Sequence, residues 1–406
     1  MGRILHLLVA ASLLLAGCAS VPWARDDATP EPAQVTDGSA ERAALNARVY
    51  DAVVRHVVRR FHRREAISDF RAHAAAQRDA VVAQPDEAGL YAGLSTLLER
   101  LDDDHSYVTS PGSRVRHDAL RAGTAVADTG LRTQLVGETY FVSTVRPDSP
   151  AAGAGVLPGW RLVDIDGVPT ALAAPPADNV RRALRLLDEH DREHLLALTP
   201  RMMPPLPRHE LRRLDGGIAH LRFEAFDRET HRWLLEQMDA LEEARPRGIV
   251  LDLRGNGGGH GGMATVTHAF FHPGTQPLLT LQRRFFRQTY VAGPMPHHRG
   301  EPMVVLVGPT TASMAEILAA RLQETGRALV VGQRTRGAVV ATRGIDLPDG
   351  GLLHLGMFGL TTAGGQALEK RGVLPDVEVD LDWQAVREGG DPVLDAALEK
   401  LATLMP

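Results

Sequence analysis

Residues 304–318 read Val304-Val305-Leu306-Val307-Gly308-Pro309-Thr310-Thr311-Ala312-Ser313-Met314-Ala315-Glu316-Ile317-Leu318. The apolar run that leads into this stretch, Met303 to Val307, is typical of a fully buried strand, and Gly308-Pro309 ends it. Apolar residues then recur at helical spacing, so a helix is expected to begin near Ser313. The stretch therefore predicts a buried strand, a short loop and a helix.

Ser313 stands between that strand and that helix, and its position allows two roles. A hydroxyl fixed there can be a hydrolase nucleophile, since N–H groups at a helix start can face a developing oxyanion. Alternatively, Ser313 only caps the helix, and Glu316, three residues on, completes a capping box. The stretch by itself favours the cap, because capping boxes are common.

Composition limits the classes of function. The chain has 406 residues, 44% hydrophobic and 23% charged, which allows two or three domains with a large core. A net charge of −5 without a broad basic cluster excludes nucleic acid as an expected partner. The one cysteine, Cys18, rules out an internal disulfide, and the two lysines are Lys370 and Lys400. Neither a metal nor a cofactor is expected.

The first residues have the pattern of a secretory signal. Arg3 precedes an apolar run that is too short for a membrane span, and small residues follow it. Leu15-Ala16-Gly17-Cys18 resembles the bacterial lipoprotein box, which implies cleavage before Cys18 and lipid on its sulfur; the alternative is an ordinary signal with an incidental cysteine. The absence of Asp after Cys18 suggests the outer membrane, with the protein on its periplasmic face. We expect residues 1–18 to be the signal and residues 19–41 a flexible tether.

Residues 42–117 are expected to form a helical domain. Apolar residues share one helix face in two runs, which are Ala44, Leu45, Val49, Val53, Val54, Val57, Val58 and Phe61, and then Tyr91, Leu94, Leu97, Leu98 and Leu101. The second run ends at Asp102-Asp103-Asp104-His105-Ser106-Tyr107. Charged residues at a helix-to-loop junction carry function more often than helix interiors do, so this junction is a candidate site.

Residues 118–215 are predicted to be rich in strands. Their pattern resembles a PDZ domain through Ser149-Pro150-Ala151, Ala154-Gly155, Gly159, Leu162, Ile165 and Gly167, with Trp160 where the family usually has Asp. The resemblance implies that a peptide adds as an extra strand and that its terminal carboxylate binds the loop Gly130, Leu131 and Arg132. The alternative is a β-domain that serves only as a spacer.

Residues 216–406 are predicted to be an α/β core. Buried strands alternate with helices, which implies a mostly parallel sheet covered by helices. A glycine-rich loop, Arg254 to Gly262, follows the strand Ile249–Leu253. Glycines let a backbone approach a ligand closely. A Walker-type phosphate loop is excluded because no Gly-Lys-Ser/Thr follows.

Taken together, these segments resemble the tail-specific, or C-terminal processing, serine peptidase family. The matching segments are Leu101–Tyr107, the PDZ pattern, Asp252–Gly258, Thr311–Glu316, Gly326–Gly332 and Gly372–Asp376, in the family's order. The resemblance implies a crotonase/ClpP-like α/β serine protease core, and an endopeptidase that acts on unstructured or C-terminal peptide segments. It also implies that Ser313 is the nucleophile, which reverses the preference for a cap.

The family has two catalytic plans. One pairs the serine with a lysine at the position of Ala338, so it fails here unless Lys370 substitutes. The other resembles the core protease of tricorn and implies His105 as base, Ser313 as nucleophile and Glu369 as the supporting carboxylate. An oxyanion hole would come from N–H groups of Gly257 or Gly258 and of Met314.

Three alternatives stay open from the sequence. Asp104 could orient the His105 ring in place of Glu369, and His260 beside the glycine loop could be the base. The missing lysine also allows a catalytically dead scaffold that binds peptides through the PDZ-like domain. A non-peptide esterase would share the same three residues, and only the PDZ pattern weighs against it.

Overall fold

The computed structural model describes residues 33–405, apart from 171–172, 174–175, 284–285 and 296–297. The expected signal segment, Cys18 and most of the expected tether lie outside the described residues. The described chain falls within one unit, Pro32–Pro406, and the domain boundaries expected inside it stay predictions. Among the described helices, none has the length and apolar character that crossing a membrane requires.

A mostly parallel sheet forms the centre of the C-terminal half, as the alternating apolar runs predicted. Its strands lie in the order β10 (His209–Leu214), β11 (Ile218–Phe223), β12 (Gly248–Asp252), β15 (Met303–Val307), β16 (Leu329–Gly332) and β19 (Val377–Glu378). The β10–β11 pair is antiparallel, and the other neighbours are parallel. β15 lies between β12 and β16, and all of its residues are buried.

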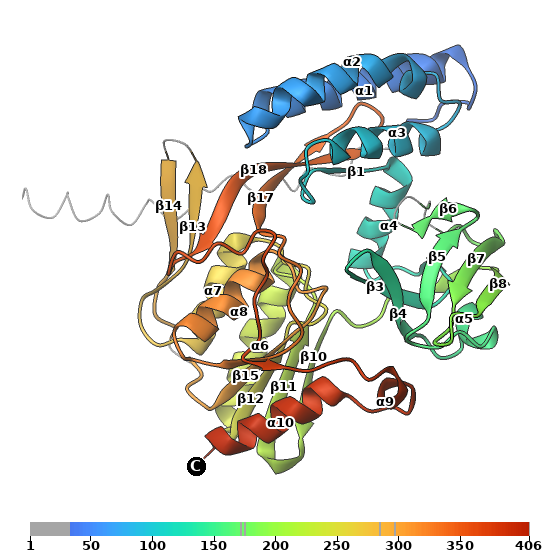
Figure 1. The fold of residues 1–406 in the computed structure, drawn as a ribbon. Coiled ribbons are helices and arrows are strands. Elements are labelled where there is room, and N and C mark those ends of the chain that lie inside the picture. The colour runs from blue at the N-terminus through green and yellow to red at the C-terminus, as the bar shows by residue number, and fades with distance from the viewer. Residues whose placement is uncertain (1–32, 171–172, 174–175, 284–285, 296–297, 406) are drawn as a thin grey trace, which may run out of the picture. The chain divides into compact units, whose positions relative to one another are not determined.

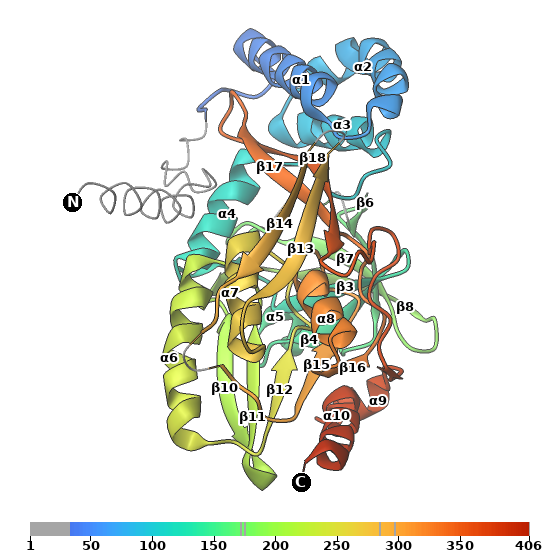
Figure 2. The same cartoon turned by 90° about the vertical axis from the view of Figure 1, so that its left-hand side faces the viewer.

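Helices cover both faces of this sheet (Figures 1 and 2). α10 (Pro392–Leu404) packs Leu401 against Val304 of β15 on one face. On the other face, Val305 of the same strand joins a core with α6 (Arg228–Ala244), α7 (Gly261–Phe271) and α8 (Met314–Glu324). Successive strand residues thus face opposite apolar layers, which explains the continuous apolar runs in the sequence.

A second sheet connects the N-terminal part of the chain to this core. Its strands are β1 (Tyr107–Thr109), β18 (Leu352–Thr362), β13 (Gln276–Arg283), β14 (Phe286–Ala292) and β17 (Val340–Asp346). β1 pairs antiparallel with β18, so that Tyr107 lies opposite His354 and Thr109 opposite Leu352. The junction that contains His105 is thereby attached to a hairpin of the C-terminal half.

Three helices pack over that hairpin (Figure 1). They are α1 (Ala40–Arg60), α2 (Ile67–Val82) and α3 (Glu87–Glu99), with a short 3₁₀ turn, η2 (Arg64–Ala66), between the first two. Val53 of α1 and Leu94 of α3 are fully buried, in one cluster with Leu353 and Leu355 of β18. The predicted apolar faces therefore pack as expected, except for Ala44, which is exposed.

Residues 118–215, which were predicted to be rich in strands, form mainly strands in the structure. A short pair, β2 (Val126–Asp128) with β9 (Arg201–Met203), stands beside a sheet whose main order is β3 (Leu131–Val136), β4 (Thr139–Val145), β5 (Arg161–Ile165), β7 (Arg182–Leu187) and β8 (Glu193–Leu198). β6 (Val168–Pro169) pairs with β5, and α5 (Pro150–Gly153) follows β4. The expected boundary at residues 117–118 falls inside a helix, α4 (Pro111–Arg121). The PDZ assignment of this sheet stays a prediction.

A C-terminal strap binds this sheet to the rest of the chain. α9 (Trp383–Arg387) stacks the Trp383 ring on Phe141 of β4, with ring centroids 6.0 Å apart. Arg387 Nε donates to the carbonyl of Pro158 at 2.9 Å. Gly159, which follows Pro158, must be glycine, because a Cβ there would lie 2.8 Å from Cγ of Trp383.

Candidate active site

Ser313 lies where β15 gives way to α8, in an unusual backbone conformation. Its φ and ψ are 56° and −121°, a region that non-glycine residues seldom adopt. Strained backbone at a strand-to-helix turn is how α/β hydrolases expose a nucleophilic serine. The Ser313 N–H is shared between Ala338 O and Glu316 Oε2, each at 2.9 Å.

Glu316 does more than cap the helix, which the sequence did not indicate. Its carboxylate is fully buried and accepts from Thr335 Oγ1 at 2.5 Å, Gly337 N at 2.7 Å and Ala338 N at 2.9 Å, besides Ser313 N. Burial raises the pKa of Glu316, and these hydrogen bonds act in the opposite direction. The carboxylate therefore fixes the loop 335–338 to the residue predicted to be the nucleophile.

The glycine loop lies directly against Ser313. Gly258 has a φ of 97°, and a Cβ on it would come within 2.6 Å of the Ser313 Cβ and 3.1 Å of Met314 N. Only glycine fits there. Ala312 N also donates to Asn256 O at 3.0 Å. The glycine loop and Ser313 therefore lie against each other.

The three N–H groups expected to form an oxyanion hole differ in their partners. Gly258 N–H donates to Asn256 Oδ1 at 2.8 Å, and Gly257 N–H donates to Glu224 O at 3.2 Å. Within the described residues, Met314 N–H has no acceptor. In this conformation Met314 is ready to donate, whereas Gly258 would first have to release Asn256. Their role stays a prediction.

His105 meets Glu369 across 264 residues of sequence. The residue is 8% exposed, and its Nε2 lies 3.2 Å from Glu369 Oε2, which also accepts from Val339 N at 2.6 Å. Among the described residues no hydrogen bond joins His105 to Ser313. The two are nevertheless linked, since Ala338 O accepts from Ser313 and the next residue, Val339, donates to Glu369.

The environment of Glu369 keeps its carboxylate ionised. Burial alone would raise its pKa, but the hydrogen bonds from His105 and from Val339 N–H, with the charges of His105 and His62, outweigh burial and lower the pKa. A carboxylate that is ionised near neutral pH can orient an imidazole and stabilise its protonated form.

A buried polar network holds the His105 segment in place, and sequence reasoning missed it. Ser106 Oγ donates to Asp103 Oδ2 at 2.5 Å and accepts from Gly356 N of β18 at 3.0 Å. His62 N–H donates to the carbonyl of Gly356 at 3.2 Å. Burial is the main cause of the lowered pKa of His62. The charged run at residues 102–107 was the only signal of this network in the sequence.

The other candidate bases lie in different surroundings. Asp104 is exposed and, within the described part of the chain, forms no hydrogen bond or ion pair, so Glu369 and not Asp104 contacts the ring. The Lys370 ammonium is half exposed and pairs with Asp102 at 2.5 Å. His260 precedes α7, where its N–H donates to Phe226 O, and burial lowers its pKa.

The loop predicted to bind a peptide carboxylate already holds an internal one. Gly130 N–H donates to Asp128 Oδ1 at 2.8 Å, and Arg132 Nη1 donates to Asp128 Oδ2 at 3.0 Å. Asp128 is buried, 4% exposed. Leu131 begins β3, which is the edge strand of its sheet, so one side of this strand is open to a further strand.

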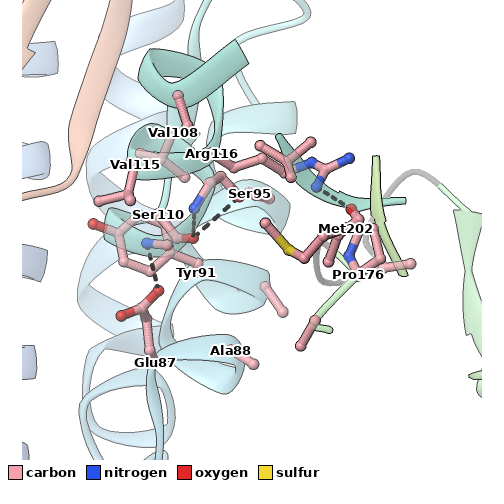
Figure 3. Close-up of a pocket in the computed structure, with 18 of the residues that line it drawn as sticks. Glu87, Ala88, Tyr91, Ser95, Val108, Ser110, Val115, Arg116, Pro176 and Met202 are labelled. Carbon is pink, nitrogen blue, oxygen red and sulfur yellow. Dashed lines mark hydrogen bonds between the residues drawn. The ribbon is translucent and has the colours of Figure 1, made fainter. Parts of the chain in front are cut away.

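Two large cavities flank α4. The first, of about 600 Å³, is lined mainly by apolar groups from α3 and α4 and from β2 and β9, including Tyr91, Val115 and Met202 (Figure 3). None of the candidate catalytic residues lines it. The second, of about 730 Å³, reaches the active-site loops at Gly255 and Thr310.

The fold and this arrangement define the class as serine peptidases. Residues 217–379 match the family model described as "Peptidase family S41". The matched segment contains both Ser313 and Glu369. Over these residues the chain is similar to peptidase family S41.

Known proteins similar to the chain agree with this class. The C-terminal processing peptidase of Tetradesmus obliquus chloroplasts is 27% identical over 325 residues, which cover 72% of this chain and 68% of that protein. The carboxy-terminal processing protease CtpA of Bacillus subtilis is 25% identical over 297 residues, 70% of this chain and 62% of that protein. A solved photosystem II D1 C-terminal processing protease is similar in fold, with a TM-score of 0.59 and 24% identity over 82% of this chain and 93% of that one.

Proposed function

We propose that this protein is a serine endopeptidase that cleaves unstructured or C-terminal peptide segments, with Ser313 as nucleophile, His105 as base and Glu369 as the carboxylate that orients the base. The observation that carries the proposal is the pairing of His105 with Glu369 beside the loop that binds Ser313. The names of the similar proteins support C-terminal segments as substrates.

The proposed reaction follows serine-protease chemistry. Neutral His105 takes the proton of the Ser313 hydroxyl as the oxygen attacks the scissile carbonyl, and returns it to the leaving amine. A water then attacks the acyl-enzyme with the same base. Met314 N–H stabilises the oxyanion, joined by Gly258 N–H after it releases Asn256. For this step the Nδ1 atom of His105 must reach the Ser313 hydroxyl, because its Nε2 faces Glu369 Oε2.

The test uses purified protein and an unfolded substrate. Ser313→Ala and His105→Ala should each lower kcat by several orders of magnitude, whereas Lys370→Ala should leave it nearly unchanged. Loss of activity in Lys370→Ala with retention in His105→Ala would favour the lysine plan. Absence of cleavage by the parent, together with no labelling of Ser313 by a serine-directed phosphonate, would leave only a peptide-binding scaffold.

We also propose that the enzyme works in the cell envelope, lipid-anchored through Cys18. The sequence pattern around Cys18 supports this location. Full-length protein should fractionate with membranes, and Cys18→Ala should release it to the soluble fraction; equal distribution of both would refute the anchor.

A further inference from the structure

The cavity that reaches Gly255 and Thr310 extends from the active-site loops to β3, the edge strand of its sheet, and to β4 beside it. Its walls come from α4, from residues 132–134 of β3, from Ser143 and Thr144 of the neighbouring β4, from residues 205–208 and from the end of β11 (labelled in Figure 1). Gly255 lies three residues before Gly258, and Thr310 three residues before Ser313. A volume of about 730 Å³ lies within the range of ligand-binding pockets. An extended segment in this cavity could pair with β3 and reach the nucleophile's loop.

The walls carry a surplus of positive charge. The charged lining side chains are Arg116, Arg121, Arg132, Arg208, Arg222 and Glu224. Arg208 is paired with Asp227 and Glu229, and Arg222 with Glu224.

The surplus comes from the other three arginines. Arg116 and Arg132 share the single carboxylate of Asp128. Arg121 is exposed at the end of α4 and, within the described part of the chain, has no ion pair or hydrogen bond. Guanidinium groups recognise carboxylates through paired, charge-assisted hydrogen bonds.

We propose that this cavity binds the carboxyl-terminal segment of the substrate and selects segments with acidic side chains, with Arg121 as a specificity-determining residue. The proposal rests on the proposed peptidase function. Asp128 already accepts from the Gly130 amide, so the arginines of the cavity, and not the predicted backbone loop, receive the carboxylates of the ligand.

The test measures binding separately from cleavage. Fluorescein-labelled disordered peptides that end in an acidic tail, or in the same tail with amide side chains, are titrated into Ser313→Ala protein by anisotropy. The acidic tail should bind about two- to fivefold more tightly, the size of one exposed ion pair, and added salt should reduce the difference. Arg121→Gln should remove most of this preference, Arg121→Lys should keep it, and Arg71→Gln, an exposed change on α2, should leave it intact.

Three outcomes would overturn the proposal. They are equal affinity for the two tails, an equal loss of preference in Arg71→Gln, and displacement of the peptide by inorganic phosphate at the same concentration as by unlabelled peptide. Because no bond is cleaved in this assay, a negative result here concerns the acidic preference alone. Failure of the proposed peptidase function would appear in the cleavage assay, as cleavage that does not depend on Ser313 or as no cleavage.

Discussion

The Glu316 carboxylate offers the sharpest test of how the site is held together. Oε1 accepts from Thr335 Oγ1 and Gly337 N, and Oε2 accepts from Ser313 N and Ala338 N. Glu316→Gln keeps the shape but replaces one oxygen by an NH2 group. Either orientation of the amide leaves at least one buried backbone N–H facing a donor.

The cost follows from the number of donors left without an acceptor. One or two such groups, at about 1–3 kcal/mol each, predict a loss of roughly 1–6 kcal/mol in the free energy of unfolding. Because the same bonds position Ser313, kcat/KM should fall as well. Urea unfolding and cleavage of an unfolded substrate measure the two effects, and Glu236→Gln, an exposed change on α6, is the matched control.

A protonated Glu316 would give the opposite result. Burial raises its pKa, and glutamine closely resembles a protonated glutamate. If Glu316→Gln unfolds and cleaves like the parent, the four hydrogen bonds do not end on a carboxylate, and the reasoning above is wrong.

Three further predictions concern the glycine loop, a buried histidine and the catalytic carboxylate. Gly258→Ala should lower kcat/KM by roughly a hundredfold, the size of a lost oxyanion donor, because the added Cβ would collide with Ser313. Gly257→Ala should be tolerated, because a Cβ added there would meet no atom within 4 Å beyond its chain neighbours. Equal activities of the two variants would contradict this. Burial lowers the pKa of His268 to about 3, so the unfolded chain takes up a proton between pH 7.5 and 5 that the folded chain does not. Urea unfolding should therefore show that the protein loses about 2 kcal/mol of stability when the pH is lowered from 7.5 to 5. His268→Leu should lack this loss. The pKa of Glu369 lies below its ordinary value of 4.5, so its contribution to the free energy of unfolding is present above that pH and is lost as the pH falls. Glu369→Gln should therefore flatten the acid side of the curve of stability against pH, and it should lower kcat more than it raises KM. An acid side that the substitution leaves unchanged would disprove the His105–Glu369 bond.

The elements of the core could be predicted because their signals are local. The apolar run Met303–Val307 became β15. The run Tyr91–Leu101 is buried as expected. Each of these patterns has one dominant period and needs no distant partner to identify it.

Other features could not be read locally. α4 has few apolar residues, and its start at Pro111 looks like a turn signal until Ser110 is seen to cap it. The pairing of His105 with Glu369 was implied only by resemblance, since no local pattern reports contacts between residues far apart. From the sequence, Glu316 looked like half of a capping box, because only Ser313 among its four hydrogen-bond donors is a near neighbour. The other three donors belong to the distant segment 335–338.

The strap formed by α9 has a practical consequence for watching this enzyme work. An indole wedged against Phe141 and a glycine sits at a joint between two parts of the chain, and its emission depends on the polarity around it. A motion of the strand-rich sheet during turnover that separates Phe141 from Trp383 would change the surroundings of that indole. Because the chain has four tryptophans, a variant that keeps Trp383 as its one tryptophan would report such a motion by stopped-flow fluorescence without an added dye.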